Sequence, residues 1–130
     1  QSVKGMTAGE ASCKDGGVII IAASCKEGHG GQALYEAFKN MESPQKILDD
    51  IHSVPRNETK PYQWKIQILA RILNHYKVIV VTQDCEHQVI RDMHMTPAST
   101  LDEALSIARG TMGPDASITI IPNGSTVILE

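Results

Sequence analysis

The residues with the most evident chemical potential lie in the stretch VIIIAASCKEGHGG, residues 18–31. Cys25 and His29 are four residues apart, with Lys26 and three glycines beside them. A thiol next to a lysine can have a lowered pKa and act as a nucleophile. Cysteine and histidine side chains can also bind zinc, and glycine-rich loops can hold phosphate. Catalysis, metal binding and phosphate binding are therefore the chemistries this stretch offers.

Each of these interpretations lacks part of its usual pattern. GHGG does not have the spacing of a G-x-G-x-x-G dinucleotide site, and no G-K-S or G-K-T follows it as in a P-loop. Cys25 and His29 have no second ligand pair at zinc spacing, and the other four histidines show no i, i+4 pair. A tight connection stays equally open, in which the glycines take positive φ, His29 donates a hydrogen bond within the loop and Cys25 is a small packing residue.

Composition narrows the class of protein. The 130 residues suffice for one compact domain, and 42% hydrophobic and 21% charged residues are ordinary for a globular protein. No apolar run approaches the roughly 20 residues that span a bilayer. A net charge of -3 gives no overall attraction for nucleic acid or anionic lipid, so we expect neither as a partner. Three cysteines without C-x-x-C or a signal peptide predict free thiols and a cytoplasmic location.

Segments with the periodicity of strands alternate with segments of helical periodicity. Continuous β-branched runs predict buried strands at 17–23 and 77–82, and HMTPA a short extended piece. Helices are expected at 31–39, between Pro44 and Pro55, from a first turn containing Pro61, at 85–93 and from the capping box Thr100–Glu103 onward, with Leu101, Ala104, Leu105 and Ala108 facing inward.

The fold class follows from this alternation. Strands separated by helices indicate βαβ units and a mostly parallel sheet. Asn123-Gly124, between SITII and STVIL, predicts a C-terminal antiparallel β-hairpin at one edge. We therefore expect an α/β protein, a three-layer α/β/α sandwich, with residues 1–130 forming a single domain.

Two single residues have ordinary interpretations from the sequence alone. Lys4 stands in a segment of small residues, where a solvated surface charge is the usual role. Trp64, the only tryptophan, lies four residues before Ile68 on a predicted helix, which favours a core anchor. The opening residues Gln1 to Gly5 do not look like an initiator methionine and its tail, so we expect the chain to have been cut from a longer protein.

Five blocks of sequence resemble the C-terminal domain of the nickel-dependent lactate racemase family. They are SVKGMTAGEA, GVIIIAASCKEGHGG, VPRNETKPYQWKIQILARIL, HMTPASTLDEALSIA and ITIIPNGSTVIL, and they follow in order over essentially the whole chain. The resemblance implies a C-terminal, substrate-cleft-closing domain of a larger enzyme, whose N-terminal domain is absent from these 130 residues.

The resemblance also implies a reaction. In this family the N-terminal domain carries a nickel pincer nucleotide and two acid–base histidines. Hydride moves from C2 of a 2-hydroxy acid to the cofactor and returns to the opposite face, which inverts the carbon. Relatives act on several hydroxy acids and sugar acids.

Three residues of this chain match the family's substrate-binding positions. The resemblance implies that Lys4, in SVKG, holds the substrate carboxylate, that Gln1 is a hydrogen-bonding neighbour and that Trp64, in QW, forms part of the pocket wall. A fixed carboxylate keeps the reacting carbon in place in both directions of the reaction. The glycine loop is expected near the interdomain cleft, with no catalytic role.

These implications define the expected partners. We expect no catalytic residue, cofactor or metal in this chain, and an inactive isolated domain. Its partners would be the N-terminal domain of the same polypeptide and a small 2-hydroxy acid. A stand-alone α/β binding or regulatory domain, which holds a phosphorylated or carboxylated molecule at Gly28–Gly31, is the alternative. An in-frame upstream domain bearing histidines and a lysine favours the racemase, and a start codon just before Gln1 favours the binding domain.

Overall fold

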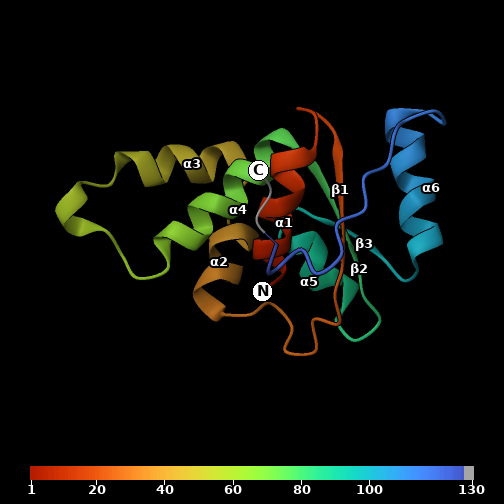
Figure 1. Cartoon of the computed structure of the whole chain (residues 1–130). Coiled ribbons are helices and arrows are strands. Elements are labelled where there is room, and N and C mark those ends of the chain that lie inside the picture. Colours follow the sequence, from red (N-terminus) through yellow and green to blue (C-terminus); the bar gives the residue numbers. More distant parts are fainter. Residues whose placement is uncertain (128–130) are drawn as a thin grey trace.

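The protein, described here by a computed structural model over residues 1–127, is built from three layers. The elements in chain order are α1 (Ser2–Ser12), β1 (Val18–Ala22), α2 (Gln32–Lys39), α3 (Pro44–Ser53), the 3-10 turn η1 (Arg56–Glu58), α4 (Gln63–His75), β2 (Lys77–Val81), α5 (His87–Asp92), β3 (Thr96–Ala98) and α6 (Leu101–Met112). Figure 1 shows α6 on one side of the sheet and α1, α2, α4 and α5 on the other. The predicted α/β class is confirmed.

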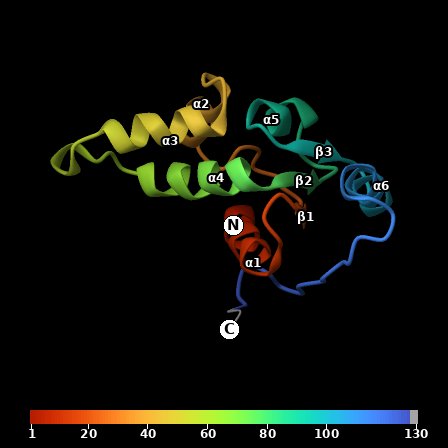
Figure 2. The ribbon, with the colours of Figure 1, turned by 90° about the horizontal axis from the view of Figure 1, so that it is seen from above.

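The sheet has three parallel strands in the order β1-β2-β3. Ile19, Val78 and Val80 enter the larger core beneath α1 and α4, whereas Ile79 packs with Ala104 of α6 on the opposite face. Both faces of the sheet are therefore covered, which explains why its strands read as continuous apolar runs. Helices α3 and α4 pack against each other and project away from the sheet, with η1 at the tip (Figure 2).

Helix α1 is an element that the sequence pattern did not predict. Its small residues allow it to lie close to β1, because a Cβ atom added at Gly9 would stand 2.8 Å from Cγ2 of Ile19. One added at Gly5 would stand 3.4 Å from Cδ1 of Ile21. Only Met6 and Ala8 of the helix are buried. The contact with the sheet therefore relies on the close approach of the helix backbone. For this reason the helix has no apolar stripe that the sequence could reveal.

Side-chain caps begin α3 and α6 as predicted. The Ser43 hydroxyl accepts a hydrogen bond from Lys46 N (3.2 Å), and that of Thr100 accepts one from Glu103 N (3.1 Å). The Glu103 carboxylate accepts from Ser99 N (2.7 Å), one residue before the N-cap. Each hydroxyl satisfies a backbone donor that the first helical turn would leave without a partner.

Two details of the predicted helices are wrong. Pro61 precedes α4 instead of lying in its first turn, because Tyr62 takes a left-handed φ of 69° and forms the N-cap. Leu101 is 55% exposed instead of facing inward, because burial in α6 begins one turn later, at Ala104. Along residues 1–127, none of the helices has the length and apolar character needed to cross a bilayer.

The predicted C-terminal hairpin is not seen over residues 117–127. Residues 117–121 pair with no strand of the described chain, whereas the turn at Asn123 is present, with Thr126 N donating to Asn123 O (2.9 Å). Gly124 packs against Gly5 of α1, which draws this turn onto a helix instead of leaving it at a sheet edge. Residues 128–130, the end of the second predicted strand, lie outside the described residues.

Candidate functional site

Two of the candidate residues, Gln1 and Lys4, lie with the glycine loop at the carboxyl edge of the sheet, the edge at which the parallel strands end. Helix α1 leads through a short turn into β1 and packs antiparallel along it (Figure 1). Its N-terminal turn, which carries Lys4, therefore lies at the carboxyl edge, as does the start of the loop 23–31 after β1. Trp64 stands apart from this edge, because α4 projects away from the sheet and its first turn lies toward η1 (Figure 2). Open α/β sheets bind ligands at this edge.

Gln1 and Lys4 share the first turn of α1. Lys4 N donates to Gln1 O (3.0 Å), and both side chains are exposed. Over residues 1–127 no carboxylate pairs with the Lys4 ammonium. Ser2 Oγ lies 3.8 Å from Cys25 Sγ, which joins this turn to the glycine loop. The structure thus presents a lysine that is available to an anion beside the loop.

The glycine loop is a tight connection. Gly28 N donates to Cys25 O (2.9 Å), and Gly28 and Gly30 have φ values of 69° and 72°, which glycine adopts without strain. Nδ1 of His29 accepts a hydrogen bond from Gly31 N (3.1 Å), so the prediction that His29 donates within the loop is wrong.

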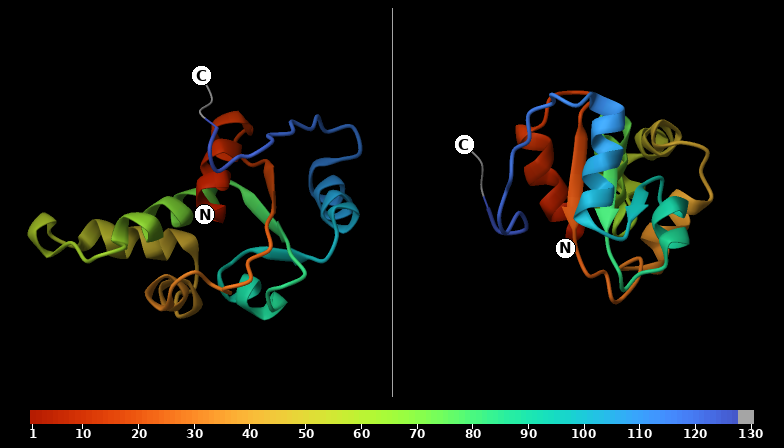
Figure 3. Two further views of the ribbon diagram at one scale, coloured as in Figure 1. Left: turned by 60° about the horizontal axis from the view of Figure 1, so that its bottom comes forward. Right: turned by 90° about the vertical axis from the view of Figure 1, so that its right-hand side faces the viewer.

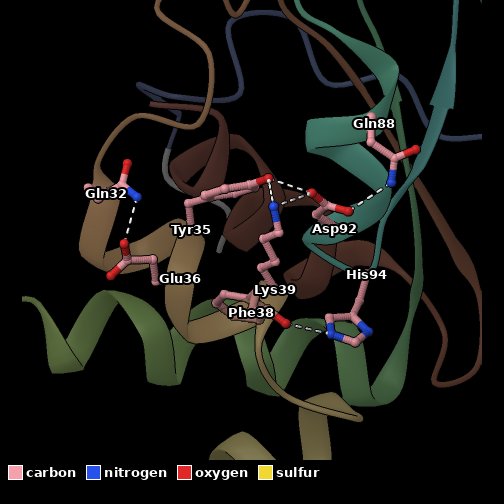
Figure 4. A network of polar contacts seen from close by, with 8 residues as sticks. All are labelled: Gln32, Tyr35, Glu36, Phe38, Lys39, Gln88, Asp92 and His94. Carbon is pink, nitrogen blue, oxygen red and sulfur yellow. Dashed lines mark hydrogen bonds and ion pairs between the residues drawn. The ribbon is translucent and has the colours of Figure 1, made fainter.

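A polar network holds Tyr35, the residue on which His29 stacks (Figure 4). The His29 and Tyr35 ring centroids are 4.8 Å apart, and the Tyr35 hydroxyl donates to Asp92. Lys39 Nζ donates to the Tyr35 hydroxyl (3.2 Å), and Gln88 Nε2 donates to Asp92 (2.8 Å). The hydrogen bond from Tyr35, then that from Gln88 and the charge of Lys39, hold the pKa of Asp92 below its usual value. The network ties α2 to α5 and so holds the end of the glycine loop.

Trp64 lies at the surface, so its interpretation as a core anchor is wrong. Its side chain is 59% exposed, because it stands in the first turn of α4, whereas burial on this helix begins at Leu69. It lines an open groove together with His52 of α3 and Arg56 of η1. Its exposed aromatic surface is available to cover a bound molecule.

Tyr62 and Lys65 lie beside Trp64, and the sequence analysis did not single them out. Lys65 Nζ lies 5.3 Å from the Tyr62 ring centroid and 5.4 Å from that of Trp64. Tyr62 and Lys65 also line a shallow hollow with residues 30–34 of the glycine loop and α2. The alternating pattern Y-Q-W-K after a proline was the available signal. In the described chain, no hydrogen bond, ion pair or cation–π contact joins Trp64 to Gln1 or Lys4.

The described residues do not fit a metal centre. Throughout residues 1–127, no three His, Cys, Asp or Glu side chains gather as metal ligands would. Burial raises the pKa of the Cys13 and Cys85 thiols, which disfavours the thiolate form that a nucleophile or a ligand needs. Instead, the carboxyl edge offers two exposed lysines without an ion pair in the described chain, Lys4 and Lys26, together with exposed loop backbone, and these groups suit the binding of a small anion.

Comparisons with known proteins agree over the whole chain. The family model described as "Lactate racemase C-terminal domain" matches residues 1–129. The chain is 55% identical over its full length to a lactate racemase of Thermoanaerobacterium thermosaccharolyticum, and 45% identical to one of Lactiplantibacillus plantarum. It spans 30% and 31% of those two relatives.

A solved structure gives the same result. The lactate racemase apoprotein from T. thermosaccharolyticum matches with a TM-score of 0.95 at 54% identity, over 98% of this chain and 31% of that one. The sequence match and the structural match therefore cover the same small share of a longer protein. The chain belongs to the lactate racemase C-terminal domain family.

Proposed function

We propose that this chain is the C-terminal domain of a larger enzyme that racemises a small 2-hydroxy acid, and that its carboxyl edge closes over the substrate. The full-length match to lactate racemases, at 55% and 45% identity, carries the proposal. The available ammonium group of Lys4 at that edge supports it. An enzyme for hydroxy acids needs a cation for the substrate carboxylate, and Lys4 can supply one.

Lys4 would act by holding the carboxylate while the hydrogen on C2 changes faces. Racemisation requires that C2 stay in one place as hydrogen leaves one side and returns to the other, so a fixed carboxylate provides the pivot. The N-terminus of α1 carries partial positive charge, which adds to the attraction. Gln1 would donate a further hydrogen bond from the same turn. Trp64 would exclude water from the closed cleft, which strengthens the ion pair.

The remaining chemistry belongs to another part of the polypeptide in this proposal. We place the nickel pincer nucleotide, which would supply the hydride acceptor when bound, and the acid–base histidines in an N-terminal domain. In residues 1–127 no three His, Cys, Asp or Glu side chains gather as metal ligands, and the proposal gives Cys25 and His29 no catalytic role. The three free thiols agree with a cytoplasmic location, where they stay reduced.

A chimaera tests the proposal directly. The matching C-terminal part of the T. thermosaccharolyticum lactate racemase is replaced by this chain, and the purified protein is loaded with cofactor. Chiral chromatography then follows conversion of one lactate enantiomer into the other. We expect racemisation, and its loss when Lys4→Ala is introduced into the same chimaera. A folded chimaera with the nickel content of the parent enzyme and no racemisation would contradict the proposal.

A further inference from the structure

Residues 117–121, the segment SITII, form an extended stretch that has no strand partner in the described chain. Ile118 is 58% exposed and Ile120 82% exposed, although isoleucine is among the residues most often buried. Over residues 1–127, no backbone hydrogen bond is made by residues 117–122. The side chains of Ile118 and Ile120 and the backbone groups of this segment are therefore left to solvent.

The composition of the segment indicates what kind of surface would cover it. Isoleucine and threonine favour strands, and alternation places Ile118 and Ile120 on one side. A β-prone segment with free backbone groups is completed by pairing with the edge of another sheet, as in β-strand addition. A helical groove would satisfy the isoleucines and leave the backbone groups unpaired.

The segment is anchored at both ends. It begins after α6, whose C-cap residue Gly113 donates to Arg109 O (2.8 Å), and it ends at the turn that packs Gly124 against Gly5 of α1. Figures 2 and 3 show it crossing from the α6 side of the molecule to α1. A domain that pairs with this segment would therefore be fixed relative to α1, whose first turn carries Gln1 and Lys4.

We propose that residues 117–121 dock as an added edge strand onto a sheet of the N-terminal domain of the same polypeptide, with Ile118 and Ile120 buried in the contact. This inference rests on the proposed function in requiring that domain. The relatives support such an occupant, because this chain spans only 30% and 31% of their length.

A second copy of the chain is a weaker occupant on physical grounds. A five-residue strand covers much less than the roughly 1,000 Å² that a stable interface between separate molecules needs. A domain in the same polypeptide is present at high effective concentration, and so a small contact suffices. The strand would then help to hold Lys4 over the substrate cleft.

Hydrogen–deuterium exchange of the full-length protein tests the inference without cofactor or substrate. We expect the amides of 117–121 to exchange on the order of 100-fold more slowly than in an unstructured peptide, because pairing protects them. Ile120→Lys should remove most of that protection. Leu101→Lys, at a leucine of α6 that is 55% exposed, should leave it unchanged. Ile120→Ser is a milder second variant that introduces no charge, and it should reduce protection as well.

Three results would overturn the inference. One is unprotected exchange of 117–121 in the full-length protein, and another is protection that survives both variants at Ile120. The third is protection that depends on protein concentration, with Ile120→Lys converting a dimer to a monomer in light scattering. Failure of the proposed function is distinguishable, since a protein without racemase activity can still show the protected strand.

Discussion

At the scale of single residues, the position of Lys4 gives the clearest expectation. In the full-length, cofactor-loaded enzyme, Lys4→Ala should lower kcat/KM roughly 30- to 1000-fold, because a buried substrate charge loses its partner at a cost of about 2 to 4 kcal/mol. Steady-state kinetics of racemisation measures this. Lys14→Ala, at an exposed lysine beyond the other end of α1, is the matched control and should behave as the unchanged enzyme.

The same variant separates a substrate ligand from a structural role. Lys4 is exposed and without an ion pair in residues 1–127, so Lys4→Ala should change the free energy of unfolding by no more than about 0.5 kcal/mol. Thermal melts of the 130-residue chain provide the measurement. Near-normal racemisation, or a large loss of stability, would remove Lys4 from the proposed site and weaken the proposals for Gln1 and Trp64.

The carboxyl group of Asp92 offers a second test at this scale. Tyr35→Phe removes the largest influence that lowers its pKa, so the pKa of Asp92 should rise toward its usual value. Because the folded-state pKa is lowered, the stabilisation is present above the unfolded pKa and is lost as pH falls through the folded value. Tyr35→Phe should therefore reduce stability at neutral pH more than in acid.

An NMR titration of the Asp92 side-chain carbon measures this shift. Tyr62→Phe is the control, because the structure shows no hydrogen bond between Tyr62 and Asp92, and it should leave the titration unchanged. An unaltered pKa of Asp92 in Tyr35→Phe would show that the hydroxyl contact is not the main cause of the shift.

At the scale of elements, sequence periodicity predicted the segments that bury apolar side chains of their own, because these residues recur with the period of a helix or a strand. Strands β1 and β2 and helices α2 to α6 were predicted for this reason. Helix α1 was missed, because it packs against the sheet through Gly5 and Gly9, which have no side chains and so add no apolar residues to the sequence pattern. The predicted hairpin is not seen over residues 117–127. Asn123-Gly124 indicates a turn, but the sequence around it does not show which strand residues 117–121 would pair with.

The candidate site was less predictable than the fold. Spacing drew attention to Cys25 and His29, which the structure places in a tight connection. Gln1, Lys4 and Trp64 came from the family resemblance, because an exposed lysine or tryptophan has no local pattern that distinguishes it. The start of α4 comes close to α2 only in the folded chain. The sequence therefore could not show that Tyr62 and Lys65 lie near the glycine loop.

Substitution by alanine should have opposite effects on stability at two helical glycines, one in close contact with β1 and one in open space. Gly9→Ala places a methyl group 2.8 Å from Ile19 and should destabilise the chain by about 1 to 3 kcal/mol through overpacking. Gly110→Ala on α6 meets no atom within 4 Å and should stabilise it by roughly 0.5 to 1 kcal/mol, as alanine favours a helix. Urea denaturation measures the free energy of unfolding of both variants. Equal effects of the same sign would mean that α1 lies farther from the sheet.

At the scale of the whole molecule, the proposal that the nickel cofactor is held by another part of the polypeptide can be tested by measuring nickel binding. Residues 1–127 bring together no ligand set, so the untagged chain should retain less than about 0.1 nickel per molecule after incubation and desalting, since nickel in proteins requires several coordinated ligands. In the full-length enzyme, Cys25→Ala and His29→Ala should keep the nickel content of the unaltered protein, measured by mass spectrometry of the metal. Lys4→Ala should keep it too while losing activity, because its proposed role is toward the substrate. Stoichiometric nickel on the isolated chain, abolished by His29→Ala, would instead make the glycine loop a metal site and reverse the assignment.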